Sequence, residues 1–439
     1  MSELIDCRLM EVSGHSGYIR SRKSSTVVPV FFAVCCSLFA LPALADEYHY
    51  NNILIGDRAA GMGGAYTAVA DDPSGLFYNP AGIVYAQGNN VSVSANALHQ
   101  TKTIYKNALG NGNDYERDSS ALLPNFFGII QPLGKGRVGF SYAVPDSIVE
   151  DQNQTFYNIP GTTTSKYAIN FNKSDNTYNF GPSYALELSK EFSVGATLYA
   201  HYRQNEWISN QLVNKNNGTY QWLNLFYKST EWGVKPIIGM MWSPTSKLSA
   251  GLSVSKVTIL QSDSVYQSVC SGDIAGICDP TYVPGTAPVR VISTSGEKRA
   301  YPLTSTIGVA YFPSKVLIVS ADFSYYAKAQ DAVFGDKEAT WNAAIGTEYY
   351  LDEKWAIKGG LFTDRANTPK INTGDVNALD HVDLYGASLS GSYFTRQSSI
   401  TVGGTYRQGK GKAQILGDNQ IQDVNSQALT LFVSASYFY

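Results

Sequence analysis

Residues 56–83 read GDRAAGMGGAYTAVADDPSGLFYNPAGI, and this stretch determines how the rest of the chain must be organised. It is rich in glycine and alanine, and small residues let a backbone pack closely against a surrounding wall. The pairs Asp72-Pro73 and Asn79-Pro80 favour turns. We therefore expect a compact, bent and buried segment that must lie inside a structure formed by the remaining chain. A flexible Gly/Ala linker is the alternative, but a linker gives no reason for Leu76-Phe77-Tyr78 between two turns.

The same stretch resembles the N-terminal hatch of the FadL/TodX outer-membrane transporters of hydrophobic compounds. The resemblance rests on Gly56-x-x-x-Ala60, the Gly/Ala run, Ala70-Asp71-Asp72 and Asn79-Pro80-Ala81, in that order. It implies a β-barrel of fourteen strands with a plug, the hatch, over residues 46–87. The hatch or gating positions that it implies are Gly61, Gly63, Gly64, Asp71, Asp72, Asn79, Pro80 and Ala81.

The composition favours a β-rich membrane wall. Only 16% of the 439 residues are charged, the formal net charge is -3, and Tyr (30) and Gly (39) are abundant. This composition is more typical of a membrane barrel than of a soluble α/β enzyme. The sequence has no basic cluster or nucleic-acid-binding motif, so we expect no nucleic-acid partner.

The N-terminus has the order of a secretory signal peptide. Basic residues at 20–23 precede an apolar run over 27–44, and Ala43-Leu44-Ala45 provides a small-x-small cleavage site. We assign residues 1–45 to this signal, with an upstream extension. The alternative is a membrane anchor, which Pro42 and the cleavage site disfavour. No later run approaches the about 18 apolar residues of a membrane helix, so a closed barrel is the expected way to span a membrane.

Two cysteines, Cys270 and Cys278, follow the signal and flank a short loop sequence. In an exported protein such a pair favours a disulfide. The alternative is a redox or metal pair. It is weaker, because the spacing is not Cys-x-x-Cys and no histidine lies nearby.

From residue 88 to residue 439 the chain alternates apolar and polar residues with period two, as over 192–203, 317–326 and 400–407. One face can contact lipid and the other a polar interior, so we expect an all-β transmembrane antiparallel barrel. A soluble β-sandwich is the alternative, although it would need a second layer to cover the apolar faces.

The connections alternate between tight turns, such as 133–136 and 189–191, and longer polar links, such as 148–175. Their spacing gives about fourteen strands. Aromatic residues near strand ends, Trp207 and Trp232 among them, are expected to form interfacial girdles. The apolar face of the last strand ends at Tyr439. It resembles the signal read by the barrel assembly machinery, an implied transient partner.

Catalytic and metal motifs are missing from the sequence, and we expect neither an enzyme nor a cofactor. No His-Glu-x-x-His, Gly-x-Ser-x-Gly or phosphate loop occurs. His99 or His201 facing the lumen could serve as a base in a barrel enzyme, but a solvated histidine is the simpler interpretation. Asp71 and Asp72 are interpreted as hydrogen-bonding partners of the plug rather than as catalytic acids.

Two places are candidates for ligand handling. The predicted loop 148–161 contains Phe156, Tyr157 and Ile159, which we consider for ligand capture. Pro145 lies in the predicted third strand, and proline removes a ladder donor. In the resembled family the third strand is kinked and leaves a lateral window. Pro145 either marks such a window or simply ends the strand.

The sequence therefore predicts an outer-membrane channel of a Gram-negative bacterium for the passive uptake of fatty acids or aromatic hydrocarbons. The expected partners are hydrophobic small molecules, outer-membrane lipids and lipopolysaccharide, and the expected state is a monomer. The alternatives are a secretion-associated or adhesive barrel that binds proteins, and a general porin.

Overall fold

The computed structural model describes residues 48–86, 88–110, 112–273, 289–331, 335–376, 378–415 and 420–438. The predicted signal peptide, residues 1–45, lies outside the described residues.

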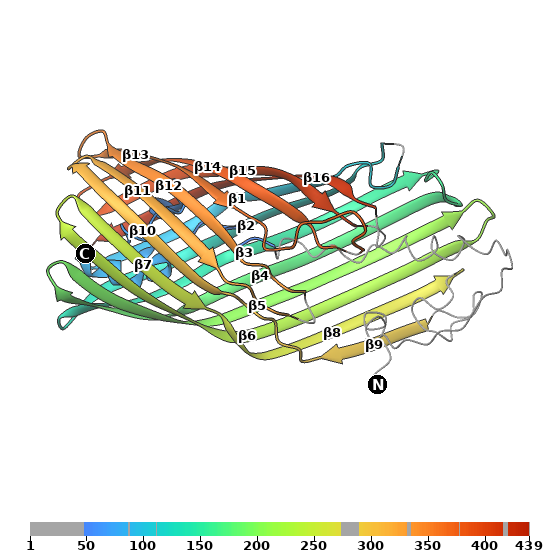
Figure 1. Cartoon of the computed structure of the whole chain (residues 1–439), viewed down its shortest axis with the longest axis horizontal. Coiled ribbons are helices and arrows are strands. Elements are labelled where there is room, and N and C mark those ends of the chain that lie inside the picture. The colour runs from blue at the N-terminus through green and yellow to red at the C-terminus, as the bar shows by residue number, and fades with distance from the viewer. Residues whose placement is uncertain are drawn as a thin grey trace, which may run out of the picture.

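The described strands form one sixteen-stranded antiparallel sheet that closes into a barrel (Figure 1). It closes because β1 pairs with β2 on one side and with β16 on the other. All strands except β8 and β9 belong to the ring, and sixteen minus two gives the fourteen expected. The ring strands are β1 Asn90–Tyr105, β2 Tyr115–Leu133, β3 Gly136–Tyr157, β4 Thr164–Ser189, β5 Phe192–Lys215, β6 Tyr220–Thr245, β7 Leu248–Lys256, β10 Leu303–Ser314, β11 Leu317–Tyr326, β12 Thr340–Tyr350, β13 Trp355–Asp364, β14 His381–Phe394, β15 Ser398–Ala413 and β16 Gln422–Phe438.

The wall is uneven in height. The hairpin of β8 (Thr258–Gly272) and β9 (Val289–Ser295) continues the sheet along the N-terminal part of β6, from Gln221 to Val234. Together with β3 to β6 it extends the wall to the right of Figure 1, well beyond β10 to β13. The barrel therefore has one tall side and one short side.

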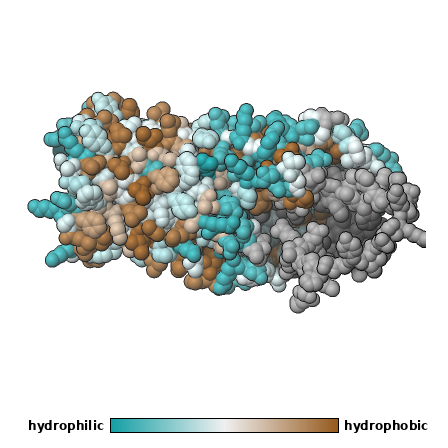
Figure 2. Space-filling model, viewed as in Figure 1, coloured by the Kyte–Doolittle hydropathy of each residue, from teal (hydrophilic) through white to brown (hydrophobic). Residues whose placement is uncertain are grey.

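Period-two alternation places apolar side chains outside and polar ones inside. On β14, Leu389 is 70% exposed, whereas its neighbour Ser390 is buried. Figure 2 shows hydrophobic residues gathered around the left half of the molecule, where the C-terminal strand ends, and hydrophilic residues to the right of them. Such a band is the surface that a barrel presents to lipid. Trp207 departs from the predicted girdle, because it is buried against Phe171 on the inner face.

The short turns occur where the sequence predicted them, for example between Leu133 and Gly136 and between Ser189 and Phe192. Several predicted loops are strands instead. The link expected over 148–175 is mostly β3 and β4, which are separated only by residues 158–163. In this part of the wall the apolar side chains of β4, such as Tyr167, Ile169 and Phe171, face inward rather than toward lipid.

The N-terminal segment, residues 48–86, forms short helices inside the ring: α1 (Asp57–Gly61), α2 (Gly75–Tyr78) and the 3-10 helix η2 (Pro80–Tyr85). They contact strands on several sides of the barrel, including β3, β5 and β15. Within the described residues, no helix is long and apolar enough to cross a membrane.

Replacing Leu389 with arginine tests the lipid-facing band. A charge on the lipid side of a barrel strand costs about 2–4 kcal/mol near the middle of the bilayer. We expect Leu389→Arg to lower the free energy of unfolding by about this amount in urea titrations of the protein in vesicles. Val376→Arg is the matched control, since Val376 is 59% exposed but lies in a connection. Equal losses in both variants would contradict the assignment of the band.

Candidate functional site

Glycines on the barrel wall make room for the N-terminal segment. A side chain at Gly195 would place its Cβ 2.5 Å from the carbonyl carbon of Pro80, and one at Gly360 would lie 2.4 Å from that of Met62. These separations are too short for any residue with a Cβ, so glycine is required for this close approach of two backbones. Eight strands carry an inward glycine against the segment: Gly128, Gly139, Gly195, Gly239, Gly251, Gly308, Gly346 and Gly360.

Asn79 joins two parts of the segment to the wall and is fully buried. Its side-chain amide donates to the Thr67 carbonyl at 2.8 Å and to the Met240 carbonyl of β6 at 3.0 Å. Its side-chain oxygen accepts from the backbone N–H of Ala81 at 3.2 Å and so caps η2. Pro80 and Ala81 then pack against the wall at Gly195. The structure thus brings the predicted residues Asn79, Pro80 and Ala81 together.

Ion pairs hold the segment between these backbone contacts. The guanidinium of Arg58 pairs with Asp71 within the segment and with Glu348 of β12, at 2.8 Å from the latter. Lys358 approaches the same Glu348 at 3.6 Å. Glu348 is fully buried, and the two cations beside it compensate the cost of burying its carboxylate. Asp71 therefore has the hydrogen-bonding position that the sequence predicted.

The other predicted positions of the segment are fixed by single hydrogen bonds or by their backbone conformation. Asp72 accepts from the backbone N–H of Ser74 at 2.7 Å, and burial raises the pKa of its carboxyl to about 6. The carbonyl of Gly61 accepts from Ser388 at 2.8 Å. Gly63 and Gly64 have positive φ of 66° and 84°, a conformation that favours glycine.

Residues 48–55, which we name the leader, cross the lumen before this fixed part. The Asp364 carboxylate accepts from the backbone N–H groups of Tyr50 and Asn51, at 3.3 and 3.1 Å. Arg407 pairs with Asp364 at 2.6 Å and donates to the Asn52 side chain at 3.1 Å. The ring of Tyr50 stacks on Tyr326 with centroids 4.2 Å apart. The leader is therefore held by polar contacts rather than by close backbone packing.

The barrel wall has a break between β2 and β3. Phe126 pairs with Ala143 and Ser119 with Glu150, but no backbone pair joins residues 120–125 to residues 144–149. Each strand carries a proline in this interval, Pro124 and Pro145, and neither proline has an N–H to donate. The register of β3 with β4 also shifts between Ala143 and Asp146. Pro145 lies within β3, which continues to Tyr157, so the simpler interpretation that it ends the strand is wrong.

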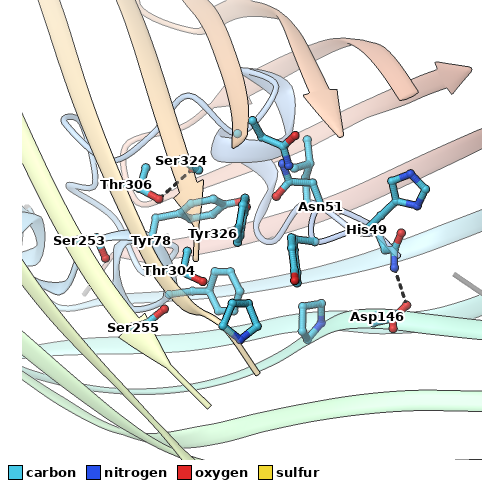
Figure 3. A pocket seen from close by; sticks show the side chains of 18 of the residues that line it. His49, Asn51, Tyr78, Asp146, Ser253, Ser255, Thr304, Thr306, Ser324 and Tyr326 are labelled. Carbon is cyan, nitrogen blue, oxygen red and sulfur yellow. Dashed lines mark hydrogen bonds between the residues drawn. The ribbon is translucent and has the colours of Figure 1, made fainter. Parts of the chain in front are cut away.

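The leader covers this break from the inside. Its Ile53 N–H donates to the Pro145 carbonyl at 3.1 Å. Its Asn52 amide donates to Asp146 at 3.1 Å, the bond drawn beside Asp146 in Figure 3. Asn125 of β2 donates to the Leu54 carbonyl at 3.2 Å. Three hydrogen bonds thus close the interval in which the ladder is missing.

A cavity of about 260 Å³ lies beside the leader and reaches the break. Gly64, Thr67, Phe77 and Tyr78 of the N-terminal segment line it, and Pro145 and Asp146 line its side at the break. The stacked pair Tyr50 and Tyr326 also lines it. The rest of the lining includes the hydroxyl side chains labelled in Figure 3: Ser253, Ser255, Thr304, Thr306 and Ser324. The cavity, the leader and the break therefore form one continuous site.

Two inward histidines differ from the sequence-based expectation. His99 and His201 were expected to be solvated, but they are only 1% and 2% exposed. His201 lines the cavity, as does Lys235, which the sequence analysis did not single out. The signal that could have found Lys235 is its spacing of four residues from the buried Glu231, which puts both on the inward face of β6.

The predicted capture residues lie apart from this cavity. Phe156 and Tyr157 belong to β3 rather than to a loop, and Ile159 follows that strand. Phe156 and Ile159 are buried together, whereas Tyr157 is 61% exposed. Their role in capture stays a prediction. Cys270 is disulfide-bonded. Cys278, its predicted partner, lies outside the described residues.

Substituting a wall glycine tests the close packing of the segment. We expect Gly195→Val to push η2 away from β5 and to open an ion-conducting path, which planar-bilayer recordings would detect as a larger single-channel conductance. Gly391→Val is the matched control, because nothing lies within 4 Å of a Cβ built there. An unchanged conductance in a folded Gly195→Val barrel would show that the segment is not what blocks the lumen.

Comparisons with known proteins give structural neighbours only. No family model and no curated protein matches the sequence. The structure is similar to that of a Pseudomonas aeruginosa FadL homologue, with a TM-score of 0.59 and 14% identity over 87% of this chain and 98% of the homologue. It is also similar to the P. putida toluene transporter TodX (TM-score 0.61, 12% identity, 88% and 98% covered). The Ralstonia pickettii toluene transporter TbuX gives a TM-score of 0.58 at 13% identity, with 88% and 98% covered. The chain therefore has the fold of the FadL/TodX-type barrels that its N-terminal stretch resembles.

Proposed function

We propose that the chain is an outer-membrane channel of a Gram-negative bacterium through which hydrophobic compounds enter passively. The observation that carries this proposal is the continuity of the cavity, the leader and the break in the wall. Two of the similar structures are toluene transporters, and another is a monoaromatic hydrocarbon channel. Their cargo supports a small apolar solute for this chain as well.

An apolar solute gains little from a wide water-filled pore, because it stays surrounded by water there. Contact with apolar surface is worth roughly 25 cal/mol per Å² removed from water. Phe77, Tyr78 and the stacked pair Tyr50 and Tyr326 supply such surface in the cavity. A solute that reaches the cavity is therefore held at a point where the wall beside it has no ladder.

The exit in this proposal is lateral. At the break Leu122 is 78% exposed, so the rim of the interval carries an apolar side chain on its surface. A solute that leaves between β2 and β3 would pass into the bilayer without crossing the water below the barrel. The fixed part of the N-terminal segment, from Gly56 to Tyr85, would meanwhile keep the lumen closed.

The gate in this proposal is the leader. Each of its three hydrogen bonds at the break contributes about 1 kcal/mol net, so their loss costs a few kcal/mol in total. Exposing the buried Ile53 and Ile55 adds to this cost. Thermal motion can supply this, and no energy source is needed. The capture role of Phe156, Tyr157 and Ile159 on the tall side of the wall belongs to the same proposal, as does a monomeric barrel in contact with lipid and lipopolysaccharide.

A protein-binding barrel for secretion or adhesion is the second candidate. The tall wall of β3 to β6, β8 and β9 favours it, because it presents a large surface beyond the lipid-facing band. Such a function would need neither the cavity nor the break, so uptake measurements separate the two candidates.

Restoring the ladder donors at the break tests the lateral exit. We expect the double variant Pro124→Val and Pro145→Val to close the interval between β2 and β3 and to reduce the uptake of radiolabelled toluene by cells severalfold. Pro132→Val is the control, since Pro132 lies in the same β2 where the pairing with Arg137 is intact. Undiminished uptake through a double variant that folds normally would rule out the lateral exit.

A further inference from the structure

Two polar side chains in the cavity lack the partners that such groups normally have. The ammonium group of the half-buried Lys235 has no ion pair or side-chain hydrogen bond with any described residue, and it lies 4.5 Å from the centroid of the Phe77 ring. The Nε2 atom of His201 is buried and has no hydrogen-bond partner in the described part of the chain. A buried polar atom without a partner destabilises the protein. A ligand that donates to Nε2 and accepts from Lys235 would remove this cost and give the ammonium group an acceptor.

The two side chains are neighbours on the inner face of the wall. In the register of β5 with β6, His201 is opposite Gly233 and Tyr199 is opposite Lys235. His201 and Lys235 are therefore diagonal neighbours on one face, within reach of a single small molecule. Both line the cavity, together with Phe77 and Tyr301.

The hydrogen bonding of His201 determines what its free nitrogen can accept. Its Nδ1 lies 2.9 Å from the side-chain oxygen of Asn179, so Nδ1 carries the proton and donates. Nε2 of the neutral ring is then an acceptor and requires a donor from the ligand. Lys235 can only donate and requires an acceptor. A hydroxyl group is the simplest group that offers both, whereas a hydrocarbon offers neither and a carboxylate can only accept.

The rest of the cavity agrees with a small ring that carries a hydroxyl group. Its volume of about 260 Å³ suits a monocyclic compound. Phe77 and Tyr78 offer aromatic faces, and the hydroxyl side chains on the far wall, such as Ser253 and Thr304, give the cavity more polar groups than a hydrocarbon needs (Figure 3). The ring of Tyr301 lies edge-on to His201 with centroids 5.5 Å apart and adds another aromatic side chain to the lining beside Nε2.

We propose that the cavity binds a monocyclic aromatic compound with a hydroxyl group, that is, a phenol. The phenolic O–H donates to Nε2 of His201, its oxygen accepts from Lys235, and the ring packs against Phe77. This inference rests on the proposed channel function and narrows its substrate class from hydrophobic compounds in general to phenols.

The test compares the binding of p-cresol, toluene and benzoate to the purified full-length protein in detergent, measured by equilibrium dialysis with radiolabelled compounds. We expect p-cresol to bind about tenfold more tightly than toluene, the effect of a satisfied pair of hydrogen bonds. His201→Leu and Lys235→Met should remove this preference, whereas His201→Gln should retain it, because its amide oxygen can accept in place of Nε2. His99→Leu is the matched control, because His99 is an equally buried inward histidine outside this cavity, 2.8 Å from the Thr430 hydroxyl. Its replacement should leave the preference for p-cresol over toluene unchanged.

Three results would overturn the inference: equal binding of p-cresol and toluene, tightest binding of benzoate, or an unchanged preference in folded His201→Leu and Lys235→Met proteins. Heat-dependent migration on gels shows whether each variant has folded.

Uptake assays with the same compounds distinguish the failure of the phenol proposal from the failure of the proposed channel function. If toluene enters cells that carry the channel while p-cresol has no advantage, the substrate assignment fails and the channel stands. If no compound enters, both proposals fail.

Discussion

The structure depends on the close approach of two backbones, that of the N-terminal segment and that of the barrel wall around it. At Gly195 and Gly360 the segment occupies the space that a Cβ would fill. A barrel of fourteen strands is too wide for its own side chains to fill, and the smaller barrels that do so have about eight strands. The N-terminal segment fills this space, and the wall glycines make room for it. The close packing therefore depends both on the small residues of the segment and on the glycines of the wall.

This constraint divides the segment into a fixed part and a leader with different energetics. Between Gly56 and Tyr85 the segment combines backbone packing with the ion pair between Arg58 and the buried Glu348, so its release would leave a buried charge unpaired and a void. The leader packs the side chains of Ile53 and Ile55 against Phe126 and Ala143, but it makes no close backbone contact at a wall glycine and is otherwise held by hydrogen bonds to Asp364, Arg407 and the rim of the break. Local opening starts where packing is sparse and polar contacts can be exchanged for water. In the function that we propose, the leader is therefore the part that moves while the fixed part keeps the lumen closed.

The sequence predicts most of the architecture because the lipid-facing band imposes a strict period of two. Leu389 and Ser390 show this alternation, and tight turns such as 133–136 were correctly placed for the same reason. The prediction failed where lipid no longer selects the outer residues, as over 148–175, which is strand rather than loop. It also failed for Trp207 and His201, since a period of two does not tell which aromatic or polar residue is covered by partners from other strands. The break was indicated only in part: Pro145 was singled out, but its counterpart Pro124 could be recognised only once the register of β2 and β3 was known.

A polar lumen does not favour the apolar cargo that we propose, and the cavity meets this difficulty by combining both kinds of surface. The alternation that gives the barrel its apolar exterior also makes much of its interior polar. Phe77, Tyr78 and Tyr50 belong to the N-terminal segment, which is free of the period of two. The N-terminal segment thus supplies three of the aromatic side chains of the cavity, while the wall supplies Tyr326, hydroxyl groups, His201 and Lys235. A cavity with both apolar and polar surface favours a molecule that has both. This combination of surfaces follows from the geometry of a closed barrel rather than from any single residue.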